Sequence, residues 1–205
     1  MIYLKALHAI ENLRLRIHSR LIRGAFALME PCSIHPSVRI DHPEFMTIGA
    51  GTLILGGGWL YATDRRAQQP GAPQPELVIG RNVYIGHYCH LVCGGALVVG
   101  DHVLIADYVH LADELHGYED VDMPPLQQPL KIGRLEIGAG TWIGDHAVIA
   151  GNLRVGKHCV IGANAVVTHD IPDYCVAVGV PARVIKRYSI EEQAWVSANP
   201  PPLGE

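Results

Sequence analysis

An aliphatic residue recurs at every sixth position between residues 137 and 167. The series is Ile137, Ile143, Ile149, Val155, Ile161 and Val167. Glycine follows four of these residues, and the residue four places after each aliphatic is mostly small. A period of six fits neither a helix of 3.6 residues per turn nor the two-residue alternation of a simple strand. The pattern predicts a parallel β-helix, an all-β solenoid in which three hexapeptides form a triangular coil around one aliphatic column.

The composition fits a single domain with a narrow aliphatic interior. Of the 205 residues, 49% are hydrophobic but only 6% are aromatic. The five cysteines show no spacing typical of a zinc site or a redox motif, and Cys89 and Cys159 fall at the small inward position of the repeat. We expect these two to pack in the core, and the set is typical of a reducing cytoplasm. Neither a signal peptide nor a membrane-spanning run is indicated, so a cytoplasmic protein is expected.

Residues 1–30 form a separate, basic unit. No proline occurs between Leu4 and Met29, and apolar residues recur at three-, four- and seven-residue steps, at Leu7, Ile10, Leu13, Ile17, Leu21 and Leu28. This spacing predicts an amphipathic helix. Arg16, Arg20 and Arg23 fall on the other face, which suits residues 4–29 to peripheral contact with an anionic membrane. The favoured interpretation, however, is that the apolar face caps the open solenoid end or packs on a neighbouring subunit.

Two loops interrupt the predicted solenoid domain, which is expected to span residues 31–188. Residues 63–75 contain three prolines and follow a glycine run. Residues 112–131 break the repeat for longer, and long loops in compact folds often carry function. Beyond the solenoid, Ser189 to Glu192 form a capping-box pattern. This pattern predicts a short C-terminal helix and tail in residues 189–205.

Several motifs resemble one enzyme family. They are the hexapeptide frame, the run from Gly140 to Gly144, and the ending Val166 to Pro172 followed by Val178 to Ile185. The chain resembles the left-handed β-helix acyltransferases over residues 34–187, and is most similar to galactoside, maltose and exopolysaccharide (colanic acid type) O-acetyltransferases. The left hand is implied by this resemblance alone, because parallel crossovers generally favour the right hand. The resemblance also implies acetyl-CoA as the acyl donor, a carbohydrate acceptor and a homotrimer with active sites at subunit boundaries.

His116 is the best catalytic candidate among twelve histidines. Five others follow an inward aliphatic by two or three places, where the coil turns toward solvent: His87, His102, His146, His158 and His169. His116 instead lies in the loop 112–131, and Asp113 and Glu114 are expected to orient its imidazole. The resemblance implies that His116 is the general base, which takes a proton from a sugar hydroxyl as that oxygen attacks the thioester.

The resemblance places the acetyl-CoA contacts on the last coils. The backbone amide of Asp145 matches the position near the thioester carbonyl, where it would stabilise an oxyanion. Ala163 and Thr168 match corner positions beside the pantetheine and the adenine. His169 stands where relatives often have lysine. Arg183 and Lys186 match the basic pair near the nucleotide phosphates. The full set is Trp142, Asp145, Ala163, Thr168, His169, Arg183 and Lys186.

Other functions remain open alternatives. A related β-helix activity is N-acetylation of a nucleotide-linked amino sugar, and the residues from His116 to Asp120 look more like the O-acetylating branch. A second is a metalloenzyme like the β-helical carbonic anhydrases, with His87, His110 and His116 as ligands, although the motif at Arg183 belongs to CoA users. A third is a scaffold without activity, which needs no histidine-bearing loop. No metal and no nucleic acid are expected, and the acceptor is a lipid-linked or nucleotide-linked sugar or an oligosaccharide.

Overall fold

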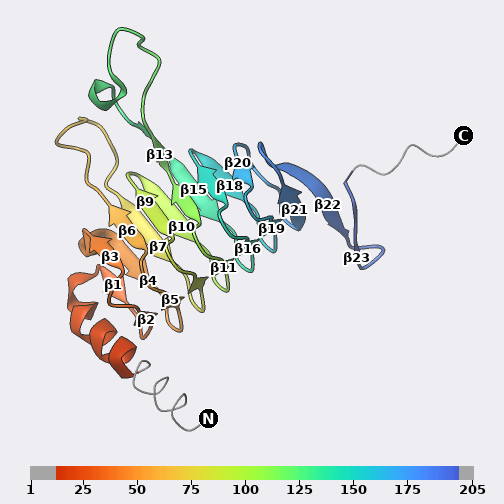
Figure 1. Ribbon diagram of the computed structural model, residues 1–205, viewed down its shortest axis with the longest axis horizontal. Coiled ribbons are helices and arrows are strands. Elements are labelled where there is room, and N and C mark those ends of the chain that lie inside the picture. Colours follow the sequence, from red (N-terminus) through yellow and green to blue (C-terminus); the bar gives the residue numbers. More distant parts are fainter. Residues whose placement is uncertain (1–12, 199–205) are drawn as a thin grey trace, which may run out of the picture.

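The protein is described by a computed structural model that covers residues 13–198. Short strands wind into a long prism with three flat faces, here called A, B and C (Figure 1). Within a face, strands of successive coils pair in parallel. Face A contains six strands in the order β1 (Leu28–Met29), β4 (Met46–Ile48), β7 (Glu76–Ile79), β10 (Ala96–Val99), β15 (Arg134–Ile137) and β18 (Leu153–Val155).

Faces B and C follow the same plan, apart from antiparallel pairing of the last strands of face B. Face B contains β2 (Ser33–Ile34), β5 (Leu53–Ile54), β8 (Tyr84–Ile85), β11 (Leu104–Ile105), β16 (Trp142–Ile143), β19 (Val160–Ile161), β21 (Cys175–Val178), β22 (Arg183–Ser189) and β23 (Ala194–Ser197). Face C contains β3 (Arg39–Asp41), β6 (Trp59–Ala62), β9 (His90–Cys93), β12 (His110–Ala112), β17 (Val148–Ala150) and β20 (Val166–Val167). The solenoid predicted from the six-residue period is therefore confirmed.

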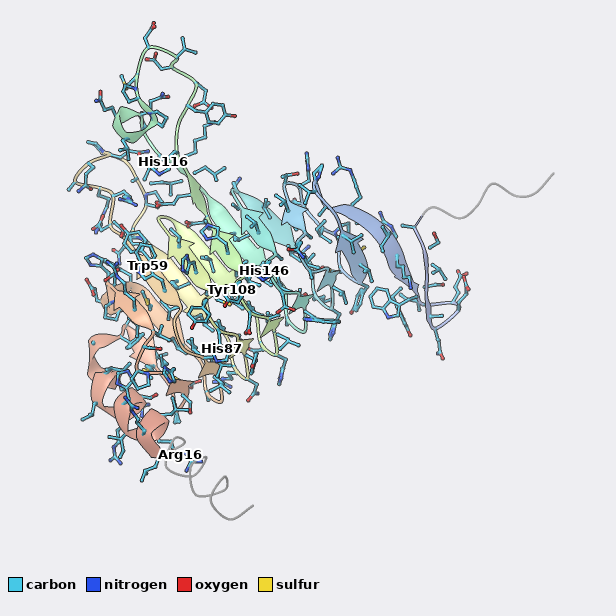
Figure 2. The ribbon with its side chains drawn as sticks, in the orientation of Figure 1. Arg16, Trp59, His87, Tyr108, His116 and His146 are labelled. Carbon is cyan, nitrogen blue, oxygen red and sulfur yellow. The ribbon has the colours of Figure 1, made fainter. Side chains whose placement is uncertain are left out.

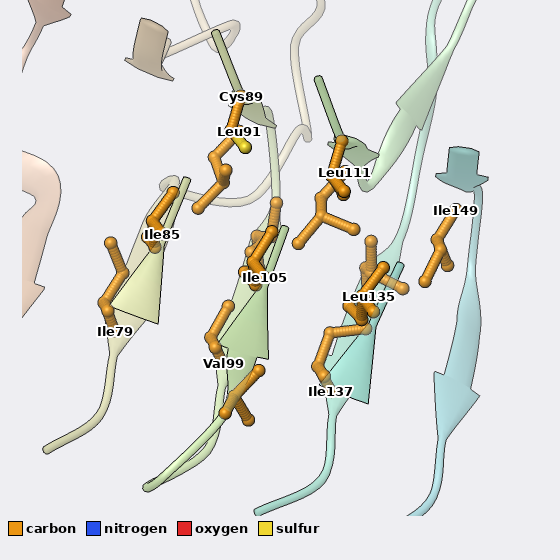
Figure 3. Close-up of a cluster of buried hydrophobic side chains, with 14 of the residues drawn as sticks. Ile79, Ile85, Cys89, Leu91, Val99, Ile105, Leu111, Leu135, Ile137 and Ile149 are labelled. Atoms are coloured by element: carbon orange, nitrogen blue, oxygen red, sulfur yellow. The ribbon is translucent and has the colours of Figure 1, made fainter. Parts of the chain in front are cut away.

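The register explains why the period is six. Ile143 pairs with Ile161 on face B, and Ile149 pairs with Val167 on face C, so one coil takes three hexapeptides. All four side chains are buried, and the interior is a stack of aliphatic residues (Figure 3). The repeat thus specifies the core directly, because each inward residue lies on its counterpart one coil away. Cys89 and Cys159 are buried in this core, as predicted.

The corners between faces carry stacked aromatic side chains. His102, His146 and His158 adopt a left-handed backbone conformation, with φ of 58°, 60° and 51°. The His146 ring stacks on Tyr108 with centroids 4.8 Å apart, and the His158 ring stacks on Tyr174 at 5.6 Å. These three histidines therefore lie at solvent-exposed corners, as the sequence indicated.

The N-terminal helix caps the first coil, but not with the predicted face. The described helix spans residues 13–22 and continues into the 3-10 turn η1 (Arg23–Ala25), so the predicted extension to Met29 is wrong because Leu28 and Met29 form β1. Residues 4–12 of the prediction lie outside the described part. Buried Ser19 makes the contact: the Ile34 N–H donates to its Oγ at 2.8 Å. No helix among residues 13–198 is long and apolar enough to cross a membrane.

The predicted C-terminal helix is wrong. After Ser189 the chain turns and forms β23, which pairs with β22 in an antiparallel hairpin. Ser189 does make the contact expected of a capping residue, because its Oγ accepts the Glu192 N–H at 3.2 Å. The contact closes a tight turn instead of starting a helix, since β21 offers β22 a strand edge to pair with.

Both predicted loops leave the prism. Residues 63–75 connect β6 to β7, and a longer excursion connects β12 to β15. The longer one begins as an antiparallel ribbon of β13 (Glu114–Leu115) and β14 (Lys131–Ile132), carries the turn η3 (Pro125–Gln127), and projects far from the prism (Figure 1). We call residues 114–132 the arm. A third, small interruption is the turn η2 (Pro43–Phe45).

Candidate active site

His116 lies at the base of the arm, directly after β13. Its side chain is exposed and forms no hydrogen bond or ion pair with any residue in the described range 13–198. The next residue is buried Gly117, where an added Cβ would lie 2.6 Å from the Pro129 carbonyl oxygen. The chain after His116 therefore packs tightly against the returning strand of the arm, and the imidazole is left to solvent and to ligands.

Asp113 does not orient His116. Its carboxylate is fully buried and accepts the N–H groups of Gly94 and Gly95, both at 2.8 Å. Burial raises the pKa of Asp113, and the two amide hydrogen bonds oppose that rise. The predicted role is thus corrected: Asp113 fastens the start of the arm to the glycine turn after β9, because buried amides need an acceptor.

Glu114 also points away from His116. Its carboxylate pairs with Arg65 at 2.8 Å, and the two side chains are only 9% and 23% exposed. Gln69 extends this contact, since its side-chain amide both donates to and accepts from the Leu130 backbone at 3.1 Å. Loop 63–75 therefore braces the arm. Sequence periodicity could not identify Arg65 and Gln69 as supporting residues, because a contact between two loops leaves no periodic signal.

The Asp145 backbone amide lies at the corner between faces B and C, where aspartate side chains link some of the successive coils. The His87 N–H donates to Asp107 Oδ1 at 2.7 Å, and the Asp107 N–H donates to Asp145 Oδ1 at 3.0 Å. The next residue in this ladder is Ala163, which offers no side-chain acceptor. The Asp145 N–H consequently bonds to no residue among those described, on an exposed corner. An amide in this state is available to an oxygen of a ligand.

The other predicted acetyl-CoA contacts lie near this corner and beyond it. Ala163 sits one coil above, since a Cβ on Gly144 would lie 2.7 Å from its backbone nitrogen. Thr168 Oγ1 hydrogen-bonds His169 Nδ1 at 2.8 Å at the far end of β20. Arg183 begins β22, after a segment whose Ala182 N–H donates to the Val166 carbonyl of β20 at 2.8 Å. The remaining two, Trp142 on β16 and Lys186 on β22, are exposed.

Within one chain, His116 and the open Asp145 amide lie at opposite ends of face C. The Asp145 corner precedes β17, whereas His116 follows the end of β12, and these strands are parallel neighbours. Figure 2 shows the same separation between His116 and His146, the residue after Asp145.

An aromatic and imidazole row runs along face C toward the arm. Trp59 Nε1 donates to Asp41 at 2.7 Å, the Trp59 and His90 rings meet edge to face at 6.0 Å, and His90 meets His110 at 6.2 Å. Burial, and then the neighbouring His90, lower the pKa of His110.

The sequence also allows His87, His110 and His116 as metal ligands. Across residues 13–198, no three side chains of His, Cys, Asp or Glu lie close enough to hold an ion. His87 instead lies 3.4 Å from Asp107 at its corner.

Sequence comparisons place the repeat among transferases. A family described as bacterial transferase hexapeptide (six repeats) matches residues 135–169. A probable acetyltransferase of Mycobacterium tuberculosis is 34% identical over 142 residues, which span 67% of this chain and 45% of that protein. A candidate lipopolysaccharide biosynthesis O-acetyl transferase of Escherichia coli is 28% identical over 177 residues, 82% of both chains. The chain thus spans less than half of the mycobacterial relative.

Solved structures share the fold. A galactoside acetyltransferase in complex with coenzyme A superposes with a TM-score of 0.60 at 27% identity, covering 85% of this chain and 72% of that one. An N-acyltransferase from Bacillus cereus, in complex with dTDP and 3-hydroxybutyryl-CoA, gives a TM-score of 0.70 at 21% identity over 85% and 90% of the two chains. Together with the hexapeptide match, these likenesses show that the chain is a left-handed β-helix protein, with the repeat of the bacterial hexapeptide transferases over residues 135–169.

Proposed function

We propose that this protein transfers an acetyl group from acetyl-CoA to a hydroxyl of a carbohydrate in surface-polysaccharide assembly. The observation that carries the proposal is the open Asp145 amide at a corner where the two preceding coils have theirs occupied. An oxyanion forms when a thioester is attacked, and a fixed, unoccupied N–H is the group that stabilises it. The galactoside acetyltransferase that shares this fold is named for the same kind of transfer.

His116 supplies the base in this proposal. Its imidazole takes the proton from the sugar hydroxyl as that oxygen forms a bond to the thioester carbonyl carbon. The tetrahedral intermediate places its negative oxygen at the Asp145 N–H. Collapse breaks the carbon–sulfur bond, and the imidazolium returns the proton to the leaving CoA thiolate. Because neither Asp113 nor Glu114 contacts His116, the ring is free to meet the hydroxyl directly.

A homotrimer completes the site in this proposal. The arm carries His116 away from its own Asp145 corner, and the tip of the arm holds Val121 and Leu126, which are 93% and 88% exposed. Large apolar side chains at the end of a projecting arm favour contact with another chain. Three parallel prisms would place the arm of one copy against the corner of the next. Acetyl-CoA would then lie between copies, with Arg183 and Lys186 toward its phosphates.

The second candidate is N-acylation of a nucleotide-linked amino sugar. It is favoured by the Bacillus cereus N-acyltransferase, which was solved with dTDP and superposes closely. An amine must lose its proton before it attacks, and an acidic group near the amine helps to guide the ammonium form. The carboxylates that precede His116 are instead engaged by Gly94, Gly95 and Arg65. This engagement supports the hydroxyl as acceptor.

The test measures both the donor and the bond that forms. The full chain is incubated with acetyl-CoA and a panel of lipid-linked and nucleotide-linked sugars, and release of free CoA identifies the acceptor. The acetylated product is then treated with mild alkali. An ester releases acetate and supports the proposal, whereas a product that survives alkali is an amide and replaces it with N-acylation. Absence of CoA release with every sugar would contradict both candidates.

A further inference from the structure

The N-terminal helix presents an apolar stripe to solvent. Leu13, Ile17 and Leu21 follow one another at four-residue steps along helix 13–22, and they are 58%, 52% and 78% exposed. Side chains four residues apart lie above one another on a helix surface. The helix meets the first coil with a different face, that of Ser19. The stripe is therefore not used by the core.

Arginines border the stripe on both sides. On the helix surface, Arg16 and Arg20 lie along one edge and Arg14 lies along the other. Residues 13–22 contain no acidic side chain, and none of the ion pairs within residues 13–198 involves these three arginines or Arg23. The face is thus apolar at its centre and cationic along its edges. Figure 2 shows Arg16 at the outer end of this helix.

A cleft of ≈ 660 Å³ lies beside the stripe, between the helix and the first coil. Arg16, Arg20 and Arg23 line it together with Glu30. Hydrogen bonds from the Ala50 N–H and from Arg81 hold the pKa of Glu30 below its ordinary value. Since this carboxylate is already paired, the three arginines leave the cleft with an excess of positive charge.

We infer that this face docks on a lipid bilayer that contains anionic lipid. The apolar stripe enters the boundary between headgroups and acyl chains, and the arginines beside it bind lipid phosphates. Charge complementarity selects this occupant: a second copy docked through the same face would bring the arginines of both helices together. The inference needs neither the proposed activity nor acetyl-CoA, so it stands or fails separately from them.

Vesicle binding by the full chain tests the inference. We expect the protein to sediment with vesicles of equal parts phosphatidylcholine and phosphatidylglycerol, but not with phosphatidylcholine alone, and binding should weaken as salt is raised. The variant Arg16→Gln/Arg20→Gln/Arg23→Gln should lower the partition coefficient by about a hundredfold, because each basic residue near the surface contributes about fivefold. The variant Ile17→Ser/Leu21→Ser should lower it by about tenfold or more.

A matched control separates the stripe from general surface polarity. Ile190 is 84% exposed in the turn between β22 and β23, and Ile190→Ser should bind vesicles like the wild type. All variants should melt at the wild-type temperature, because the changed side chains are exposed. Failure of the wild type to bind anionic vesicles, or unchanged binding by both helix variants, would overturn the inference. If the stripe variant dissociates an oligomer in light scattering and the wild type does not bind vesicles, the stripe is a contact between copies and the inference is wrong.

Discussion

The prism and the arm are stabilised in different ways. In the coil that contains Ile143, the aliphatic side chains stack on aliphatic counterparts one coil away, as Ile143 does on Ile161. Thr141, the buried polar residue of that coil, is bonded to Gly156 and Cys159. The arm has no such repetition and is held at its base by Asp113, Glu114 and the Gln69 amide. The prism is therefore stabilised by many equivalent buried contacts. A few polar contacts position the arm and leave its surface free for a ligand or partner.

The largest expected effect comes from the arm and leaves the prism intact. His116→Ala should lower turnover by about two to four orders of magnitude, the range for a positioned acid–base group. Its melting temperature should stay that of the wild type, because the imidazole is exposed and unbonded to the described residues. Steady-state kinetics with thermal unfolding checks this. The control is His158→Ala, a stacked corner histidine, and comparable losses from both variants would mean that another residue is the base.

The opposite result is expected from the core. Ile143→Ala removes a fully buried side chain from the aliphatic column, and should destabilise the protein by about 2–5 kcal/mol. Molecules that remain folded should keep near-normal turnover. Chemical denaturation measures the loss. A change at Ile143 that leaves the free energy of unfolding unchanged but abolishes turnover would contradict the separation between a stabilising prism and a catalytic arm.

The brace between the loops should give an intermediate effect. Arg65→Ala leaves the Glu114 carboxylate buried without its partner, at a cost of about 3 kcal/mol. The destabilisation should be confined to the arm and appear there as faster hydrogen exchange. The kcat should fall, with little change in the KM for acetyl-CoA. Adding Glu114→Gln to this variant removes the unpaired charge and should recover most of the stability. No recovery in the double variant would mean that the ion pair is not what positions the arm.

The smallest expected effect probes the open amide. The Asp145 side chain accepts the Asp107 N–H of the neighbouring coil. Ala163→Asp would place a carboxylate in the same relation to Asp145, so that the new side chain accepts the Asp145 N–H. We expect about a tenfold to hundredfold loss in kcat/KM for acetyl-CoA, since one oxyanion donor is occupied. Ala139→Asp is the matched control, because a Cβ on Gly100 lies as close to the Ala139 nitrogen as one on Gly144 lies to that of Ala163. Equal losses from both variants would count against the amide.

The sequence predicted the prism well because its information is repeated. Ile143 and Ile161 each indicate the same inward position, so the predicted fold does not depend on any single residue. Single-instance signals did worse. The pattern at Ser189 is shared by a helix start and a tight turn, and only the free edge of β21 decides between them. For the N-terminal helix, periodicity identified an apolar face but could not say that Ser19, on another face, would meet the core.

The site was predictable only in part, because its contacts do not repeat along the sequence. Proximity in sequence suggested that Asp113 and Glu114 orient His116, yet their partners are Gly94, Gly95 and Arg65, which are distant along the chain. The open Asp145 amide arises from an absence, the missing acceptor at Ala163, which becomes visible only when the coils are aligned in space. Loop contacts of this kind carry no period from which to infer them.

Mixing two inactive variants tests most directly whether the arm of one copy and the corner of another form one site. One chain carries His116→Ala, and the other carries Ala163→Asp with Arg183→Ala. Neither variant alone should turn over acetyl-CoA appreciably. If sites form between copies, random mixed trimers of the two chains should regain about a quarter of wild-type activity, because a quarter of the boundaries combine an intact arm with an intact corner. Activity that stays at the level of the unmixed variants would contradict a site shared between copies.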